Sequence, residues 1–198
     1  MICAVVLAAG HSERMGVPKL LLPLAGKTVI AHVVDALMAT PLDEIRVVLG
    51  AEREAIARVL DGQGLRFVVN TRPASDMLAS IRCGLRELPA GCEAVLVALG
   101  DQPTITPSLV RHLIREFRAA TRTILFPTHG GRRGHPVLFS IRHVPELLER
   151  HAGVGLRGLI EAHPDDLLPV AVDDPDVLED VDTPADYVRV AARLRGAQ

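Results

Sequence analysis

Residues 2–22, ICAVVLAAGHSERMGVPKLLL, contain the pattern from which the fold is predicted. Their first part, 2–7, is a continuous hydrophobic run, which is typical of a strand that is buried on both faces of a sheet. A loop of small and charged residues follows directly. Because ligands of open parallel sheets bind outside the carboxyl ends of the strands, we expect this loop to lie at a ligand-binding edge.

Similar apolar runs recur along the chain and alternate with segments of helical period. The runs predict further strands at 45–49, 65–69, 94–99, 123–127, 136–140 and 167–172. The helical segments are 28–39, 52–60, 77–88, 107–120, 143–151, 155–163 and 184–195. Two of these segments follow the pairs Thr106-Pro107 and Thr183-Pro184, which are typical of a helix start. The alternation predicts one α/β domain over residues 1–198, a sheet with helices on its faces.

Composition excludes several classes of protein. The chain has 198 residues, of which 48% are hydrophobic, and this share suits a globular domain rather than a disordered chain. Lys and Arg number 22 against 24 Asp and Glu, a formal net charge of −2, and aromatic residues make up only 3%. Without a basic cluster or an aromatic stacking surface, a nucleic-acid partner is not expected.

The cysteine pattern and the hydropathy predict a cytoplasmic protein. Cys3, Cys83 and Cys92 are odd in number and lack C-x-x-C spacing, so they indicate neither a disulfide framework nor a zinc site. No apolar stretch approaches the ~20 residues that a membrane helix needs. Residues 1–7 lack the charged leader of a signal peptide, and no membrane association is expected.

Three segments resemble known binding motifs but lack a residue or a neighbouring element that the motif requires. Residues 25–28 resemble the end of a Walker A loop, but its leading glycine is replaced by Leu21. The Gly-x-Gly-x-x-Gly of 153–158 follows a predicted helix, whereas a dinucleotide fingerprint follows a strand. The acidic run 173–186 lacks the glycine of a calcium-binding EF-hand loop.

The loop after the first strand is a candidate phosphate site. Ala8, Ala9 and Gly10 let the backbone approach a ligand, and successive N–H groups in such a turn can bind an anion. Arg14 and Lys19 add positive charge. The alternative is a surface loop with two solvated cations.

Two acidic segments are candidate metal ligands. Asp101, in Gly100-Asp101-Gln102-Pro103, ends an apolar run and is suited to Mg²⁺, although a turn aspartate bonding its own backbone is equally compatible. Asp180 and Asp182 would share one face of an extended segment. Alternatively, their negative charges stabilise the helix that begins after Thr183, by interacting with the positive N-terminal end of its dipole.

The segment Arg132-Arg133-Gly134-His135-Pro136 could meet an anionic substrate, or it is an exposed hairpin turn. Among the eight histidines, His135 has the most suggestive context. The others are interpreted as helix-surface residues, and no pair shows metal-ligand spacing.

Taken in order, these segments resemble the MobA-like NTP transferases, in particular the molybdenum cofactor cytidylyltransferases. The most specific block is Leu-Ala-Ala-Gly-x-Ser-x-Arg-Met-Gly-x-x-Lys-Leu-Leu-Leu over residues 7–22. The later blocks that agree in order are Asn70 with 77–85, then 100–103, 134–136, 153–155 and 180–184.

The resemblance implies a three-layer fold of the nucleotide-diphospho-sugar transferase type, with a mostly parallel sheet that binds NTP and Mg²⁺. It implies metal binding by Asp101 with Asp182, or else Asp180, and acceptor binding by residues 134–136 (Gly134, His135 and Pro136). The nucleotide-binding residues that it implies, with Arg14 and Lys19 on the phosphates, are Leu7, Ala8, Ala9, Gly10, Ser12, Arg14, Lys19, Asn70 and Ser80.

The implied reaction is transfer of CMP from CTP to a molybdopterin-type phosphate, with Arg14, Lys19 and Asp101 as catalytic residues and with release of pyrophosphate. Delivery of the product to a molybdenum hydroxylase apoenzyme would follow. Three alternatives stay open: a guanylyltransferase, another phosphorylated acceptor, or a non-catalytic nucleotide-binding partner of a molybdoenzyme. Asp76 stands where the family usually has Gly, which leaves the choice of base open.

Overall fold

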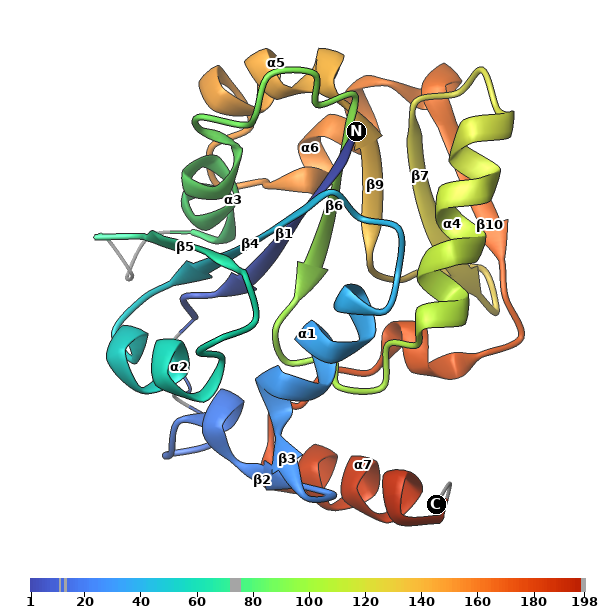
Figure 1. Ribbon diagram of the computed structural model, residues 1–198. Helices are drawn as coiled ribbons and strands as arrows, with labels where there is room; N and C mark the ends of the chain where they lie inside the picture. Colours follow the sequence, from blue (N-terminus) through green and yellow to red (C-terminus); the bar gives the residue numbers. More distant parts are fainter. Residues whose placement is uncertain (11, 13, 72–75, 197–198) are drawn as a thin grey trace.

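The computed structural model describes residues 1–10, 12, 14–71 and 76–196 (Figure 1). The described residues form an eight-stranded sheet in the order β10-β7-β9-β6-β1-β4-β5, with β8 paired to β7, and a separate two-stranded sheet of β2 and β3. The strands of the large sheet are β1 (Ile2–Ala8), β4 (Glu44–Leu49), β5 (Arg66–Val69), β6 (Ala94–Leu99), β7 (Ile124–His129), β8 (Arg132–Arg133), β9 (Val137–Ser140) and β10 (Leu167–Ala171).

The helices agree with the predicted segments to within a few residues at each end. They are α1 (Val29–Met38), α2 (Arg53–Val59), α3 (Met77–Leu85), α4 (Pro107–Ala119), α5 (Val144–Glu149), α6 (Leu156–Ala162) and α7 (Pro184–Gly196). The predicted caps are confirmed, since Thr106 Oγ1 accepts a hydrogen bond from Leu109 N and Thr183 Oγ1 accepts one from Asp186 N. Short 3₁₀ helices lie at η1 (Lys19–Leu21), η2 (Ile141–His143), η3 (Pro164–Asp166) and η4 (Pro175–Leu178).

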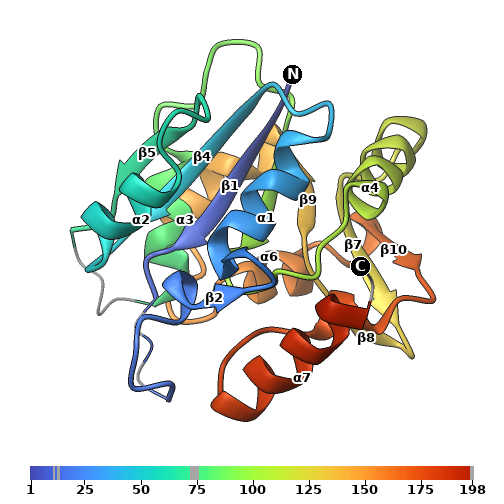
Figure 2. The ribbon, with the colours of Figure 1, turned by 60° about the horizontal axis from the view of Figure 1, so that its bottom comes forward.

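Both faces of the sheet are covered, which confirms the three layers. In β1, Ala4 and Val6 pack into one hydrophobic cluster with α1, α2, α4 and α7, while Cys3 and Val5 pack into a second cluster with α3, α5 and α6. The continuous apolar run of β1 therefore has a simple cause: alternate side chains enter opposite cores. In the two views, α7 lies beside β2 (Figures 1 and 2), where the Tyr187 hydroxyl donates to Pro23 O.

The sheet is mostly parallel, as expected. β4 and β6 flank β1 in parallel, β5 runs parallel to β4, and β10 runs parallel to β7. β9 is antiparallel to both β6 and β7, and the short β8 is antiparallel to β7. β2 (Pro23–Leu24), β3 (Lys27–Thr28) and β8 were not predicted, because two-residue strands carry no periodicity.

The register brings the loops after β1 and β6 to one edge of the sheet. Leu7 is opposite Leu99, so both strands end at the same level. Gly100 follows, and a Cβ placed on it would lie 2.8 Å from Leu7 O. Only glycine lets the two loops leave the sheet this close together.

Candidate active site

The loop after β1 is closed around Ser12. The Ser12 carbonyl accepts hydrogen bonds from Met15 N and Gly16 N at 3.1 and 3.0 Å, and its Oγ accepts one from Lys19 N at 3.0 Å. Ser12 thereby sets the start of η1, whose Leu20 is buried in the core. Two positions of the predicted motif, His11 and Glu13, lie outside the described residues.

Lys19 lies between two carboxylates that are distant in the chain. Its Nζ is 2.5 Å from Asp101 Oδ2 and 2.6 Å from Asp182 Oδ1, and its side chain is only 12% exposed. Arg14, which is 71% exposed, reaches the other oxygen of Asp182 at 2.8 Å. Four residues predicted separately as phosphate-binding cations and metal-binding carboxylates therefore form one cluster.

Two protein segments form the acidic half of this cluster. Asp101 comes directly after Gly100 at the end of β6, and its carbonyl accepts a hydrogen bond from Val181 N at 2.9 Å. Val181 is completely buried and anchors the segment between η4 and α7. Residue 182 is thus held beside Asp101 by backbone pairing and by burial of the intervening valine.

The charges of the cluster influence one another. Burial lowers the pKa of Lys19, but pairing with Asp101 and Asp182 outweighs it, so the pKa is raised and the side chain is a cation. Burial raises the pKa of Asp180, and the neighbouring carboxylates Asp101 and Asp182 raise it further. Of the two acids left open by the sequence, Asp182 makes the ion pairs with Lys19 and Arg14.

The donor set suits a divalent cation. Oxygen atoms of Asp101 and Asp182 already converge on one positive centre, the Lys19 ammonium, and Asp180 lies close enough to be affected by both. Carboxylate oxygens from one or two side chains are the protein ligands that Mg²⁺ prefers. The residues present therefore fit a Mg²⁺-like ion.

A small pocket lies beside the loop. Ala8, Gly10 and Ser12 line it together with Ala51 and Glu52. The last two were not predicted as site residues, although their position two and three residues after the end of β4, at the same edge of the sheet, was an available signal. Among the described residues, no atom lies within 4 Å of a Cβ placed on Gly10, so the backbone there is open to a ligand.

Asn70 and Ser80 are buried and bonded to one another. Asn70 Nδ2 donates to Ser80 Oγ at 3.0 Å, which joins the end of β5 to the inner face of α3. Both residues thus have a structural role, and their nucleotide-binding role stays a prediction.

Asp76 has defined partners. Its Oδ1 accepts a hydrogen bond from Ala79 N at 3.0 Å and caps α3, and its Oδ2 accepts one from Gly153 N at 2.6 Å. The carboxylate consequently joins the start of α3 to the loop before α6.

The segment 134–136 separates from the hairpin before it. Arg132 and Arg133 form the exposed β8, but Gly134 and Pro136 are buried. A Cβ on Gly134 would lie 2.4 Å from Val177 O, and His135 N donates to that oxygen at 3.0 Å. Burial lowers the pKa of His135, and the charge of Asp101 partly opposes this shift, so the imidazole lies within electrostatic reach of Asp101. The exposed-hairpin alternative therefore holds for residues 132–133 alone.

The interpretation of the remaining histidines as helix-surface residues was wrong for His129, which ends strand β7, and for His143. His143 is 3% exposed, and together with Glu146 and His163 it forms a group whose ligand atoms all lie within 4.8 Å of one another. The sequence separation of 20 residues between the two histidines hid this cluster.

A mostly parallel α/β sheet with cations and carboxylates gathered beyond the ends of β1 and β6 defines the class: the nucleotide-diphospho-sugar transferase fold. Residues 4–167 match the model of the MobA-like NTP transferase domain. The chain belongs to the MobA-like NTP transferase family.

Three proteins illustrate its similarities. Nicotine blue oxidoreductase of Paenarthrobacter nicotinovorans is 30% identical over 92% of both chains. The crystal structure of Rv0371c from Mycobacterium tuberculosis H37Rv is similar with a TM-score of 0.86 and 31% identity, over 96% of this chain and 97% of that one. Rv0371c is also known in a complex with manganese. A nucleotidyl transferase from Methanothermobacter has a TM-score of 0.87 at 28% identity, over 100% of this chain and 99% of that one.

Other relatives are longer. The chain spans only 24% of the bifunctional protein GlmU of Symbiobacterium thermophilum, to which it is 40% identical over 117 residues, or 58% of this chain. Among the described residues, no helix is long and apolar enough to cross a membrane.

Proposed function

We propose that this protein is a nucleotidyltransferase that moves CMP from CTP to a phosphorylated, molybdopterin-type acceptor. The observation that carries the proposal is the position of Lys19 between Asp101 and Asp182, with Arg14 on the second of these acids. One site thus combines cations for phosphates with carboxylates for a divalent metal. The family supports the reaction class, and the resemblance of the motifs supports the choice of CTP and molybdopterin.

The reaction joins two anions and needs little covalent chemistry from the protein. A terminal phosphate oxygen of the acceptor attacks the α-phosphorus of the nucleotide, and the bond from that phosphorus to the bridging oxygen of the β-phosphate breaks. Pyrophosphate leaves with the electron pair. Because the attacking phosphate is already ionised, positioning and charge neutralisation supply most of the rate.

The residues of this chain divide those tasks. Gly10 and the neighbouring backbone of Leu7, Ala8, Ala9 and Ser12 lie along the nucleotide, supported by Asn70 and Ser80, while Lys19 and Arg14 exchange carboxylate contacts for phosphate oxygens. Residues 134–136 face the acceptor. Asp101 and Asp182 would hold Mg²⁺, which neutralises charge on phosphate oxygens. Asp180 supports this set from the same segment.

A pyrophosphate-release assay tests the proposal. The purified chain is incubated with each of the four NTPs, with Mg²⁺ or Mn²⁺, and with molybdopterin, a sugar phosphate or no acceptor. We expect release that needs metal and molybdopterin and is fastest with CTP. Asp101→Asn should reduce it by about 100-fold or more, whereas the matched surface variant Asp35→Asn, in an exposed ion pair with Lys27, should not.

Other outcomes identify the alternatives. Preference for GTP would indicate a guanylyltransferase, and release only with a sugar phosphate would replace the acceptor. Nucleotide binding without turnover would indicate that this protein is a non-catalytic partner of a molybdoenzyme. The molybdoenzyme would then be, for example, a molybdenum hydroxylase apoenzyme. Because nicotine blue oxidoreductase aligns along nearly the whole chain, reduction of nicotine blue is measured in parallel.

A further inference from the structure

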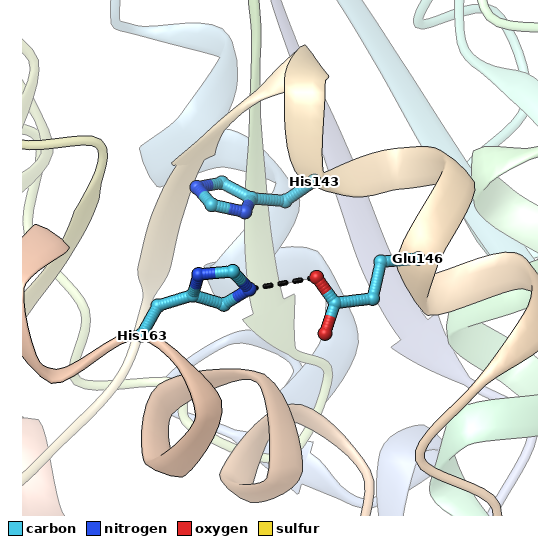
Figure 3. Close-up of side chains that lie close together, drawn as sticks. All are labelled: His143, Glu146 and His163. Carbon is cyan, nitrogen blue, oxygen red and sulfur yellow. Dashed lines mark hydrogen bonds and ion pairs between the residues drawn. The ribbon is translucent and has the colours of Figure 1, made fainter.

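A second group of metal-ligating side chains lies at the opposite edge of the sheet from Lys19. His143 ends η2, Glu146 lies in the first turn of α5, and His163 follows α6 (Figure 3). The strand before η2 ends with Ser140 opposite Ala94, at the amino end of β6, whereas Asp101 follows its carboxyl end. The length of β6 thus separates the two groups.

The three side chains point toward one another. The rings of His143 and His163 meet edge to face with their centroids 4.8 Å apart. Glu146 Oε2 is 2.7 Å from His163 Nε2 (Figure 3), and one ligand atom from each of the three residues lies within 4.8 Å of the others.

Outer partners already orient two of these side chains. The buried His143 contacts Thr123 Oγ1 through Nε2 at 2.9 Å, and the same nitrogen accepts a hydrogen bond from Arg142 Nε at 3.3 Å, whereas its Nδ1 makes no hydrogen bond with any described residue. Glu146 Oε1 is 2.6 Å from His151 Nε2, which leaves Oε2 for the centre of the group. Bonded outer nitrogens and oxygens are typical of residues that ligate a metal, because they hold the ligand atom in place.

We propose that His143 Nδ1, the Glu146 carboxylate and His163 bind a zinc-class divalent cation, with water as the fourth ligand. Two imidazoles and one carboxylate suit Zn²⁺, whereas Mg²⁺ prefers oxygen ligands alone. Tetrahedral bonds of about 2.0–2.2 Å place ligand atoms roughly 3.4 Å apart, so small rotations of Glu146 and His163 complete the site.

The charged side chains around this group are compatible with a bound divalent metal ion. Arg142, which contacts His143 Nε2, pairs with Asp166 at 2.6 Å, so its charge is offset locally. Asp166 Oδ2 also lies 3.8 Å from His163 Nδ1 and adds negative potential beside the site. When Nδ1 of His143 binds the metal, Nε2 carries the proton and donates to Thr123. Arg142 Nε then gives up its hydrogen bond to that nitrogen, while Arg142 keeps its ion pair with Asp166.

The site joins elements that are separate in sequence. His143 and Glu146 belong to the η2–α5 segment, and His163 lies between α6 and η3. A metal bound to all three cross-links these segments over one face of the sheet. The role we assign to it is therefore stabilisation of this edge, independent of nucleotide transfer at the other edge.

Zinc binding to the full chain tests the proposal directly. Chelator-treated protein is titrated with Zn²⁺ in competition with a chromophoric chelator, in an Asp101→Asn background that weakens the other site. We expect one equivalent to bind. His143→Gln and His163→Gln should each weaken binding by at least about 100-fold, since even an outer partner of a ligand contributes about 10–100-fold. The control is His112→Gln, because His112 also lies beside a glutamate, Glu116, at 3.5 Å.

Cobalt and melting experiments separate a metal site from a hydrogen-bonded cluster. Co²⁺ should give the visible absorption of a four-coordinate site in the Asp101→Asn protein and in the double variant that adds His112→Gln. The double variant that adds Glu146→Gln should not give this absorption. Zn²⁺ should raise the melting temperature of the Asp101→Asn protein and of its His112→Gln double variant by several degrees. It should leave the melting temperature of the Glu146→Gln double variant unchanged. No zinc binding to the Asp101→Asn protein, or equal binding by its His163→Gln derivative, overturns the proposal.

Discussion

Lys19 and Asp182 are 163 residues apart in the chain, yet Lys19 Nζ lies 2.6 Å from Asp182 Oδ1. This ion pair joins the first block of the motif to the last, and the shorter contact with Asp101 adds the middle block. The site is thus assembled around one partly buried ammonium.

Lys19→Ala should reduce pyrophosphate release by at least about 100-fold, because a preorganised charge on the phosphates is lost. It should also lower the melting temperature in metal-free buffer, since Asp101 and Asp182 then repel without their shared cation. Mg²⁺ should restore part of the stability but not the rate. Lys27→Ala is the control, because Lys27 pairs with Asp35 at an exposed position. Unchanged turnover would remove Lys19 from the site.

Asp101→Asn and Asp182→Asn should each reduce turnover by about 100-fold or more and weaken its Mg²⁺ dependence. Because both act through one ion, the double variant should lose much less than the product of the single losses. The measurement is a double-mutant cycle of turnover against Mg²⁺ concentration. If Asp182→Asn lowers only the melting temperature, Asp180 is the ligand to test next.

Gly100→Ala should lower the free energy of unfolding by about 1–3 kcal/mol, because the new Cβ would lie 2.8 Å from the Leu7 carbonyl oxygen and the backbone must shift. Gly10→Ala is its matched counterpart, with no described atom within 4 Å of the new Cβ. It should leave urea denaturation unchanged and weaken CTP binding. If Gly100→Ala and Gly10→Ala destabilise the protein equally, the close approach of Gly100 to the Leu7 carbonyl oxygen is not the cause.

Asp186→Asn should destabilise the protein at pH 7 by about 1 kcal/mol, as expected for loss of a helix cap. A hydrogen bond from the Thr183 hydroxyl, with the pairing to Arg189, lowers the pKa of Asp186 to about 2. The stabilisation is therefore complete above the ordinary carboxyl pKa near 4 and is lost as the pH falls through about 2. Urea denaturation from pH 7 to pH 2 checks this. The difference in free energy of unfolding between the wild-type protein and Asp186→Asn should become smaller below about pH 4. A difference that stays constant with pH would show that the carboxylate charge contributes nothing.

Asp76→Gly restores the residue usual in the family and removes the hydrogen bonds to Ala79 N and Gly153 N. If Asp76 restricts the base pocket, the ratio of CTP to GTP turnover should change in this variant. Asp76→Asn keeps a capping side chain and should retain the original ratio. An unchanged ratio in Asp76→Gly would limit Asp76 to its cap and its bond to the loop before α6.

The strands and long helices were predictable because their signals are local. The apolar run of 94–99 is β6, and Thr106-Pro107 starts α4 as its capping chemistry requires. Two features had no local signal. β8 is only two residues long, and His143 is buried because η2, which follows β9, brings it against His163.

The sequence alone determined the alternation of strands and helices, the loop after β1 and the candidate residues Lys19, Asp101 and Asp182, because strand and helix periodicity and turn chemistry act over a few neighbouring residues. Only the tertiary structure decided that Lys19 stands between the two acids, that Asp182 rather than Asp180 makes the ion pairs, and that His143, Glu146 and His163 meet. These relationships depend on strand order and register, which place loops far apart in the chain at one edge of the sheet. The physical reason is that long-range packing and backbone pairing set those positions, and no short stretch of residues encodes them.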